Sequence, residues 1–263
     1  MTMIRFLVIT LIFLTPFSVG NAAAGKRIVD LATHQEMILY SIATDYAMLG
    51  MRIDYHDPKA DMAKQVTEYE KNNAELLKIA PTAFSPDQQK QQASTWTEIK
   101  TTVNAAVDIK AMQKLYNNTK SLEKAFEGLA EKQAEQDHNA KEETYVLVGE
   151  LGMEGQRLSA LYMMKTWGAG DAAVIAKETQ EAFKEVQVVF GKLEKLQDSD
   201  AKAKAMIEKV EKDILLIEHL IDSDKSFPVL IEKSAEKLMD EVEELLTYVS
   251  AFISWLYASF ASV

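Results

Sequence analysis

The sequence has no cysteine and little glycine or proline: its 263 residues include 10 glycines and 5 prolines. Without cysteine, disulfide bonds, thiol catalysis and cysteine-ligated metals are excluded. Few glycines and prolines mean few helix breaks. Alternating runs of β-branched residues are also missing, whereas apolar residues recur at spacings of three and four along most of the chain. These patterns predict an all-α fold made of long helices.

Basic residues are in the minority. The chain has 29 lysines and arginines against 40 aspartates and glutamates, which gives a net charge of −11. Such a charge disfavours binding to nucleic acid or to anionic lipid.

The first 24 residues have the features of a secretory signal peptide. Arg5 precedes an apolar run over residues 6–17, and three alanines at residues 22–24 supply the small side chains of a cleavage site. An uncleaved membrane anchor is the alternative, although the apolar run is short for a span of about 20 residues. We therefore expect residues 1–24 to be removed and the mature protein to be periplasmic.

Five turn signals divide the mature chain, and one of them, residues 198–200 (Asp-Ser-Asp), separates the sixth helix from the seventh. Asp57-Pro58 and Ser85-Pro86 each combine an N-cap residue with proline in the first helical turn, and Phe227-Pro228 opens the last helix. The segment 168–171 contains two glycines followed by aspartate, which ends one helix and caps the next. In the helix that begins at Ser85, we expect Trp96, Ile99, Val103 and Val107 to point inward. Eight helices are predicted in two sets of four.

The two sets show internal repetition. A shift of 113 positions places Met62-Ala63-Lys64 over Ile175-Ala176-Lys177, and the same shift aligns residues 120–124 with residues 233–237. We therefore expect two tandem antiparallel four-helix bundles, over residues 25–137 and 138–263. No strong helix breaker separates the fourth helix from the fifth, so one long shared helix is expected to stack the bundles end to end.

One stretch resembles a known family. Gly149, followed by Gln156-Arg157-Leu158, Tyr162 and residues 165–168 (Lys-Thr-Trp-Gly), is similar to the sensor domain of type IV pilus chemotaxis transducers and nitrate/nitrite sensor kinases. Residues 231–239 and Tyr248 are similar to the last helix of such domains. The first copy departs from the family, because Glu36 stands where arginine is favoured.

The resemblance implies a ligand site. In nitrate-sensing relatives a small anion is held by arginine on the first helix, commonly where two subunits meet, so Arg157 and Gln156 are the candidates and a homodimer is compatible with this site. A guanidinium offers several fixed donors to an oxyanion. Tyr162 and Lys165 share the stretch and are further candidates. The alternative is structural: Arg157 packs along the bundle and the aromatic residues belong to the core.

Metal and catalytic motifs are sparse. Glu135 and His138 form one Glu-x-x-His motif, whereas a di-iron bundle needs two. The four histidines are scattered, and no glycine-rich phosphate loop is present. We expect no metal, no cofactor and no enzymatic activity.

The C-terminal segment, residues 245–263, carries no charge. Its length approaches that of a membrane span, but serine and threonine dilute it and no basic residues precede it. We expect a buried last bundle helix, with membrane association as the alternative.

These features together predict a periplasmic sensory module that recognises a small polar ligand, anionic if the resemblance holds, and signals to a membrane-bound protein. The alternative is a structural or protein-interaction module of the envelope that has no small-molecule ligand.

Overall fold

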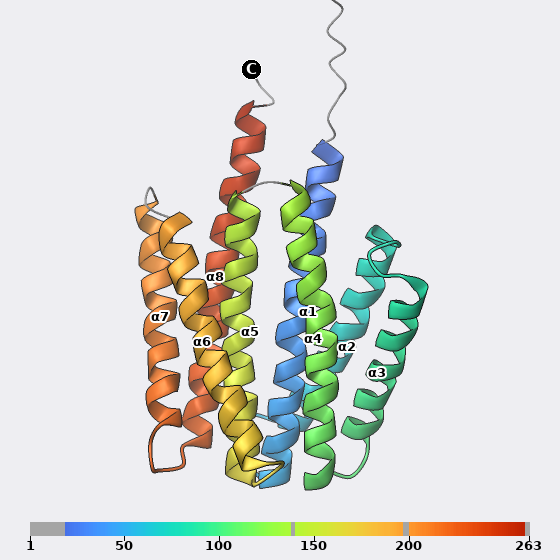
Figure 1. The fold of residues 1–263 in the computed structure, drawn as a ribbon, viewed down its shortest axis with the longest axis vertical. Coiled ribbons are helices and arrows are strands. Elements are labelled where there is room, and N and C mark those ends of the chain that lie inside the picture. The colour runs from blue at the N-terminus through green and yellow to red at the C-terminus, as the bar shows by residue number, and fades with distance from the viewer. Residues whose placement is uncertain (1–18, 138–139, 197–199, 261–263) are drawn as a thin grey trace, which may run out of the picture.

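The fold was analysed in a computed structural model, which describes residues 19–137, 140–196 and 200–260, with side chains over residues 27–135, 143–195 and 200–249. Within these ranges the chain forms helices and no strand, which confirms the all-α expectation. The eight helices run alternately up and down along one common direction (Figure 1). They are α1 (Val19–Met51), α2 (Pro58–Ile79), α3 (Pro86–Asn104), α4 (Ile109–Asp137), α5 (Ala140–Trp167), α6 (Ala172–Leu196), α7 (Ala201–Ile221) and α8 (Pro228–Phe260).

The helix starts follow local capping chemistry. The Asp57 side chain accepts a hydrogen bond from the backbone N–H of Ala60, and Ser85 forms a reciprocal capping box with Gln88. Asp171 and Asp200 likewise accept backbone N–H groups at the starts of α6 and α7. These caps confirm the predicted turns. Val107 differs from the expectation, since it lies after the end of α3 and is 37% exposed.

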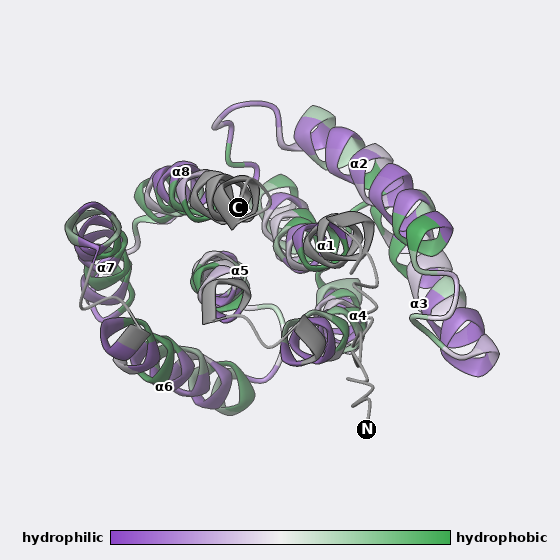
Figure 2. Ribbon diagram, turned by 90° about the horizontal axis from the view of Figure 1, so that it is seen from above, coloured by the Kyte–Doolittle hydropathy of each residue, from purple (hydrophilic) through white to green (hydrophobic). Residues whose placement is uncertain are grey.

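The two sets of four helices lie side by side. α1 packs against α2, α4 and α5, while α5 packs against α1, α4, α6 and α8. Seen from above, α5 lies inside a ring of its neighbours, and α2 and α3 cover the outer side of α1 and α4 (Figure 2). This corrects the expected end-to-end stacking: α4 and α5 are separate neighbouring helices, and no long shared helix forms.

Burial along α5 explains the side-by-side packing. Every residue from 144 to 164 is buried except Glu150, which is half-buried. A helix that is covered all round needs neighbours on every side, and a four-helix bundle stacked on another by its end would leave one face of α5 open. One continuous hydrophobic core therefore runs through both sets of helices.

Three glycines let α5 approach its neighbours closely. A Cβ atom at Gly149 would lie 2.0 Å from Thr33 of α1, and one at Gly155 would lie 2.2 Å from Leu238 of α8. At Gly152 the nearest atom belongs to Met37 of α1. In the sequence, Gly149 is part of a motif that resembles a sensor family, whereas in the structure it is part of the α1–α5 contact.

The two ends of the chain are described only in part. Residues 1–18 of the expected signal peptide lie outside the described residues, and residues 19–24 begin α1. In the C-terminal segment, Leu245, Leu246 and Val249 are buried, whereas the side chains beyond Val249 lie outside the described set. Over the residues that the structure describes, no helix has the length and apolar character needed to cross a membrane.

Candidate functional site

The four residues predicted to bind a ligand do not come together. Gln156 lies between α1 and α8, where its Oε1 accepts a hydrogen bond from the Ser41 hydroxyl at 2.9 Å. Tyr162 is buried, and its hydroxyl accepts the backbone N–H of Phe227 at 2.6 Å, so it fixes the loop before α8. Lys165 is exposed in the last turn of α5. Of the four, only Arg157 lies in a buried charged cluster.

Arg157 is held by groups from three helices. Its Nη2 lies 2.6 Å from Glu178 of α6, its Nη1 lies 3.1 Å from Glu154 of α5, and its Nε donates to the Tyr116 hydroxyl of α4 at 3.4 Å. The Arg157 side chain is only 8% exposed. Every nitrogen of the guanidinium therefore has a protein partner already.

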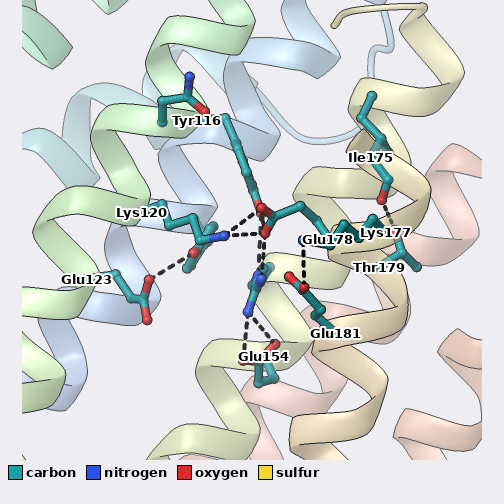
Figure 3. Close-up of polar contacts among 12 residues, drawn as sticks. Tyr116, Lys120, Glu123, Glu154, Ile175, Lys177, Glu178, Thr179 and Glu181 are labelled. Atoms are coloured by element: carbon teal, nitrogen blue, oxygen red, sulfur yellow. Dashed lines mark hydrogen bonds and ion pairs between the residues drawn. The ribbon is translucent and has the colours of Figure 1, made fainter. Parts of the chain in front are cut away.

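Glu178 joins two cations. Besides its contact with Arg157, the Glu178 carboxylate accepts a hydrogen bond from Lys120 Nζ of α4 at 2.5 Å, as the dashed lines in Figure 3 show. Burial alone would raise the pKa of Glu178, but hydrogen bonds from Lys120 and Arg157 lower it below its usual value. Glu178 is thus an ionised carboxylate that ties α6 to both α4 and α5.

A cleft of about 340 Å³ opens beside this cluster, between α4, α5 and α6. Its walls carry six glutamates against four cations, with only two apolar residues. They are Lys120, Glu123, Lys124 and Glu127 of α4, Glu150, Met153, Glu154 and Arg157 of α5, and Glu181, Lys184, Glu185 and Val189 of α6. The cleft is therefore lined mainly by charged residues and has an excess of acidic groups.

Several of these carboxyl groups resist ionisation. Burial is the main cause that raises the pKa of Glu123 and of Glu150 to about 7, and neighbouring glutamates, Glu127 among them, contribute to this rise. Burial likewise raises the pKa of Glu154 to about 8, even though the Arg157 guanidinium lowers it. Glu127 has a raised pKa for the same reason, burial first and Glu131 second. The cleft lining therefore has more acidic groups than cations, and several of these groups are partly protonated at neutral pH.

Glu36 adds a further carboxyl group from α1. It is 2% exposed, and its Oε1 atom has no hydrogen-bond partner. Burial raises its pKa well above the usual value, with further contributions from Glu123, Glu127 and Glu150. The sequence showed this residue only as a departure from the family pattern. An acid between the buried residues Gln35 and Met37 was the available signal for a buried carboxyl group.

A second polar cluster lies elsewhere on α1. Burial raises the pKa of Asp45 on α1 to about 8 and that of Glu232 on α8 to about 7. The Ser159 hydroxyl of α5 donates to Glu232 at 3.0 Å. These groups lie between α1, α5 and α8, with Asp45 buried and Glu232 half-buried, and are part of the helix packing.

Another cleft, of about 440 Å³, lies between α6 and α7, but it differs in character. Its charged residues, Glu194, Lys204, Glu208 and Glu211, are all exposed to solvent. No buried charge marks it as a built binding site, so the cleft between α4, α5 and α6 is the stronger candidate.

Metal binding is not indicated for the described residues, among which no three histidine, aspartate or glutamate side chains lie close enough together to hold an ion. His138 of the Glu-x-x-His motif lies outside the described residues.

Comparison of the chain with protein-family models, with curated proteins and with solved structures gives no match. The resemblance to chemotaxis and nitrate sensors therefore stays a prediction from sequence.

Proposed function

We propose that this protein is an exported, non-enzymatic sensory module that binds a small polar ligand in the cleft between α4, α5 and α6. The observation that carries the proposal is a cleft lined by six glutamates and four cations. Among the described side chains, four of these glutamates form no ion pair, namely Glu123, Glu127, Glu150 and Glu185. A bound ligand would supply the partners for these groups.

The position of the cleft suits signalling. α4 belongs to the first set of helices, and α5 and α6 belong to the second. A ligand that contacts all three would favour one relative position of the two sets, and small sliding of packed helices can carry such a bias to the ends of the molecule. A separate membrane-bound protein is the proposed receiver of this signal.

The geometry bears on the ligand's charge. The resemblance to nitrate sensors implied an anion on Arg157, but Glu154 and Glu178 already occupy that guanidinium. An anion would have to displace a buried carboxylate and would then face the remaining glutamates. The proposed ligand is therefore a small polar molecule for which a negative charge is not required, and of the four predicted residues only Arg157 lines its site.

Thermal melting with a panel of anions, amines, zwitterions and organic acids tests the proposal. Ligand at a hundred times its dissociation constant stabilises a protein by about 2.7 kcal/mol. We expect at least one compound to raise the melting temperature of the wild-type protein and of Glu194→Trp, which alters the other cleft. The same compound should not raise the melting temperature of Glu181→Trp, which places a bulky side chain in the wall of the proposed site.

A contrary result would be no shift with any compound, together with a protein partner captured by cross-linking in cells. That pair of findings would favour an envelope interaction module without a small ligand.

A further inference from the structure

We propose that the cleft between α4, α5 and α6 takes an elongated organic cation, a short aliphatic diamine or polyamine, held between its glutamates. This inference rests on the proposed function and adds the chemical class of the ligand.

The glutamates of the cleft are spaced in pairs. Each of the three helices contributes two glutamates four residues apart: Glu123 and Glu127, Glu150 and Glu154, and Glu181 and Glu185. Four residues rise about 6 Å along a helix and bring both side chains to one face. The cleft therefore presents carboxyl groups at two levels along its length, which a ligand with one cationic group cannot satisfy together.

The opposite directions of α4 and α5 indicate which glutamates share a level, and the interactions among these glutamates agree with it. Glu154 interacts with Glu123 and Glu185, whereas Glu150 interacts with Glu127, Glu131 and Glu185. α4 and α5 run in opposite directions, so the lower number on one helix faces the higher number on the other. One ammonium group would bridge Glu123 and Glu154, and a second would bridge Glu127 and Glu150.

The protein's own cations contact only part of the cleft's carboxyl groups. Arg157 and Lys120 both bind Glu178, and Arg157 also binds Glu154. Among the described side chains, no ion pair is formed by Glu123, Glu127, Glu150 or Glu185. Lys192 and Lys124 lower the pKa of Glu150 and of Glu127 from nearby without forming an ion pair with them. The level formed by Glu127 and Glu150 thus has carboxyl groups that no cation contacts directly.

Glu36 provides an independent observation. This residue of α1 is 2% exposed, its Oε1 has no partner, and it interacts with Glu123, Glu127 and Glu150. A buried carboxyl group without a hydrogen-bond partner is uncommon and unfavourable. Glu36 does not line the cleft, but a cation that binds these three glutamates would reduce their repulsion with it.

Other ligand classes fit less well. Among the described residues, no three carboxyl or histidine side chains lie close enough together to hold one metal ion. An anion would meet six glutamates and a guanidinium that is already occupied. A diamine places its two charges apart and its methylene groups between them, where Met153 and Val189 supply the apolar surface.

Isothermal titration calorimetry with putrescine and spermidine tests the proposal, with butylamine, magnesium chloride and sodium nitrate as comparison ligands. We expect the two polyamines to bind at least tenfold more tightly than butylamine. The double variant Glu127→Gln/Glu150→Gln should weaken polyamine binding at least tenfold. The matched control Glu208→Gln/Glu211→Gln, which removes the same charge from the other cleft, should bind as the wild type does.

Folding of the variants is checked without ligand. Replacing carboxyl groups that are costly to ionise by amides should leave the melting temperature of Glu127→Gln/Glu150→Gln equal to or above that of the wild type. Weaker binding by this variant then reports a lost contact and not a lost fold.

Three outcomes would overturn the inference. Equal polyamine affinity in both double variants would show adsorption to the acidic surface. Tighter binding of magnesium than of the polyamines would show that the cleft takes an inorganic cation and not an organic one. Binding of an anion or zwitterion that Glu181→Trp blocks, with no binding of polyamines, would refute the cationic class while leaving the proposed function intact. If no compound binds at all, both proposals fail.

Discussion

Arg157 shows what a single residue can and cannot reveal in a sequence. It was selected because a guanidinium suits anions, and the structure does place it in a polar cluster. However, its donors are directed to Tyr116, Glu154 and Glu178. It acts in the structure as a buried junction between α4, α5 and α6, at the end of the proposed ligand cleft.

Replacing Arg157 by methionine should destabilise the protein. The change keeps an apolar stem but leaves Glu154 and Glu178 without their shared cation, and breaking one side of a buried ion pair typically costs about 3–5 kcal/mol. Urea denaturation measures the change in the free energy of unfolding. Lys165→Met, on the same helix but exposed, should change it by less than about 0.5 kcal/mol. A loss below about 1 kcal/mol for Arg157→Met would show that the cluster contributes little to the fold.

At the scale of elements, α5 decides the arrangement. Its glycines admit α1 and α8 closely, and its burial from residue 144 to 164 leaves no free face. Contacts between α1 and α5 join residues 115 positions apart, such as Ser41 with Gln156 and Asp30 with Tyr145. This separation is close to the 113-position shift of the repeat, as expected for two copies lying parallel and side by side.

Two glycine substitutions separate close packing from helix propensity. In Gly149→Ala the new Cβ would lie 2.0 Å from Thr33 Cγ2, so α1 and α5 must move apart, and such overpacking typically costs about 1–3 kcal/mol. Gly191→Ala on α6 meets nothing within 4 Å and should gain about 0.5–1 kcal/mol from the better helix former. Chemical denaturation of both variants measures the two effects. An equal change in the free energy of unfolding of the two variants would contradict the close α1–α5 contact.

At the scale of the whole molecule, buried carboxyl groups should make stability depend on pH. The pKa values of Glu123, Glu150 and Glu232 are raised to about 7, and those of Asp45 and Glu154 to about 8. Between the unfolded values near 4 and these folded values, the folded protein binds more protons than the unfolded chain. The free energy of unfolding therefore falls as pH rises through this window.

We expect the melting temperature to be higher at pH 5.5 than at pH 8.5. Carboxyl groups with lowered pKa values, such as Glu70 and Glu98, make the free energy of unfolding rise with pH, but only below about pH 4.5. Melting curves at intervals across this range test the expectation, and Glu150→Gln should reduce the slope. A melting temperature that stays constant or rises with pH would show that these groups are better solvated than their burial indicates.

Local chemistry was enough to predict the helices. Caps at Asp57, Ser85 and Asp200 and the glycines at residues 168 and 170 set the helix bounds through contacts within a few residues, so they are visible in the sequence. The boundary between α4 and α5 is not visible in the sequence, because no such local signal marks it. It has no glycine or proline, and the two helices become separate neighbours because α5 buries its surface against helices distant in the chain.

The sequence by itself determined the helical class, the turns and the acidic character of this protein, because propensity, capping and charge are properties of neighbouring residues. Only the tertiary structure decided that the two sets of helices lie side by side, that Arg157 is already paired, and that glutamates from three helices line one cleft. These features depend on groups such as Glu36, Glu123 and Glu150, which lie far apart in the chain and meet only when α1, α4 and α5 pack together.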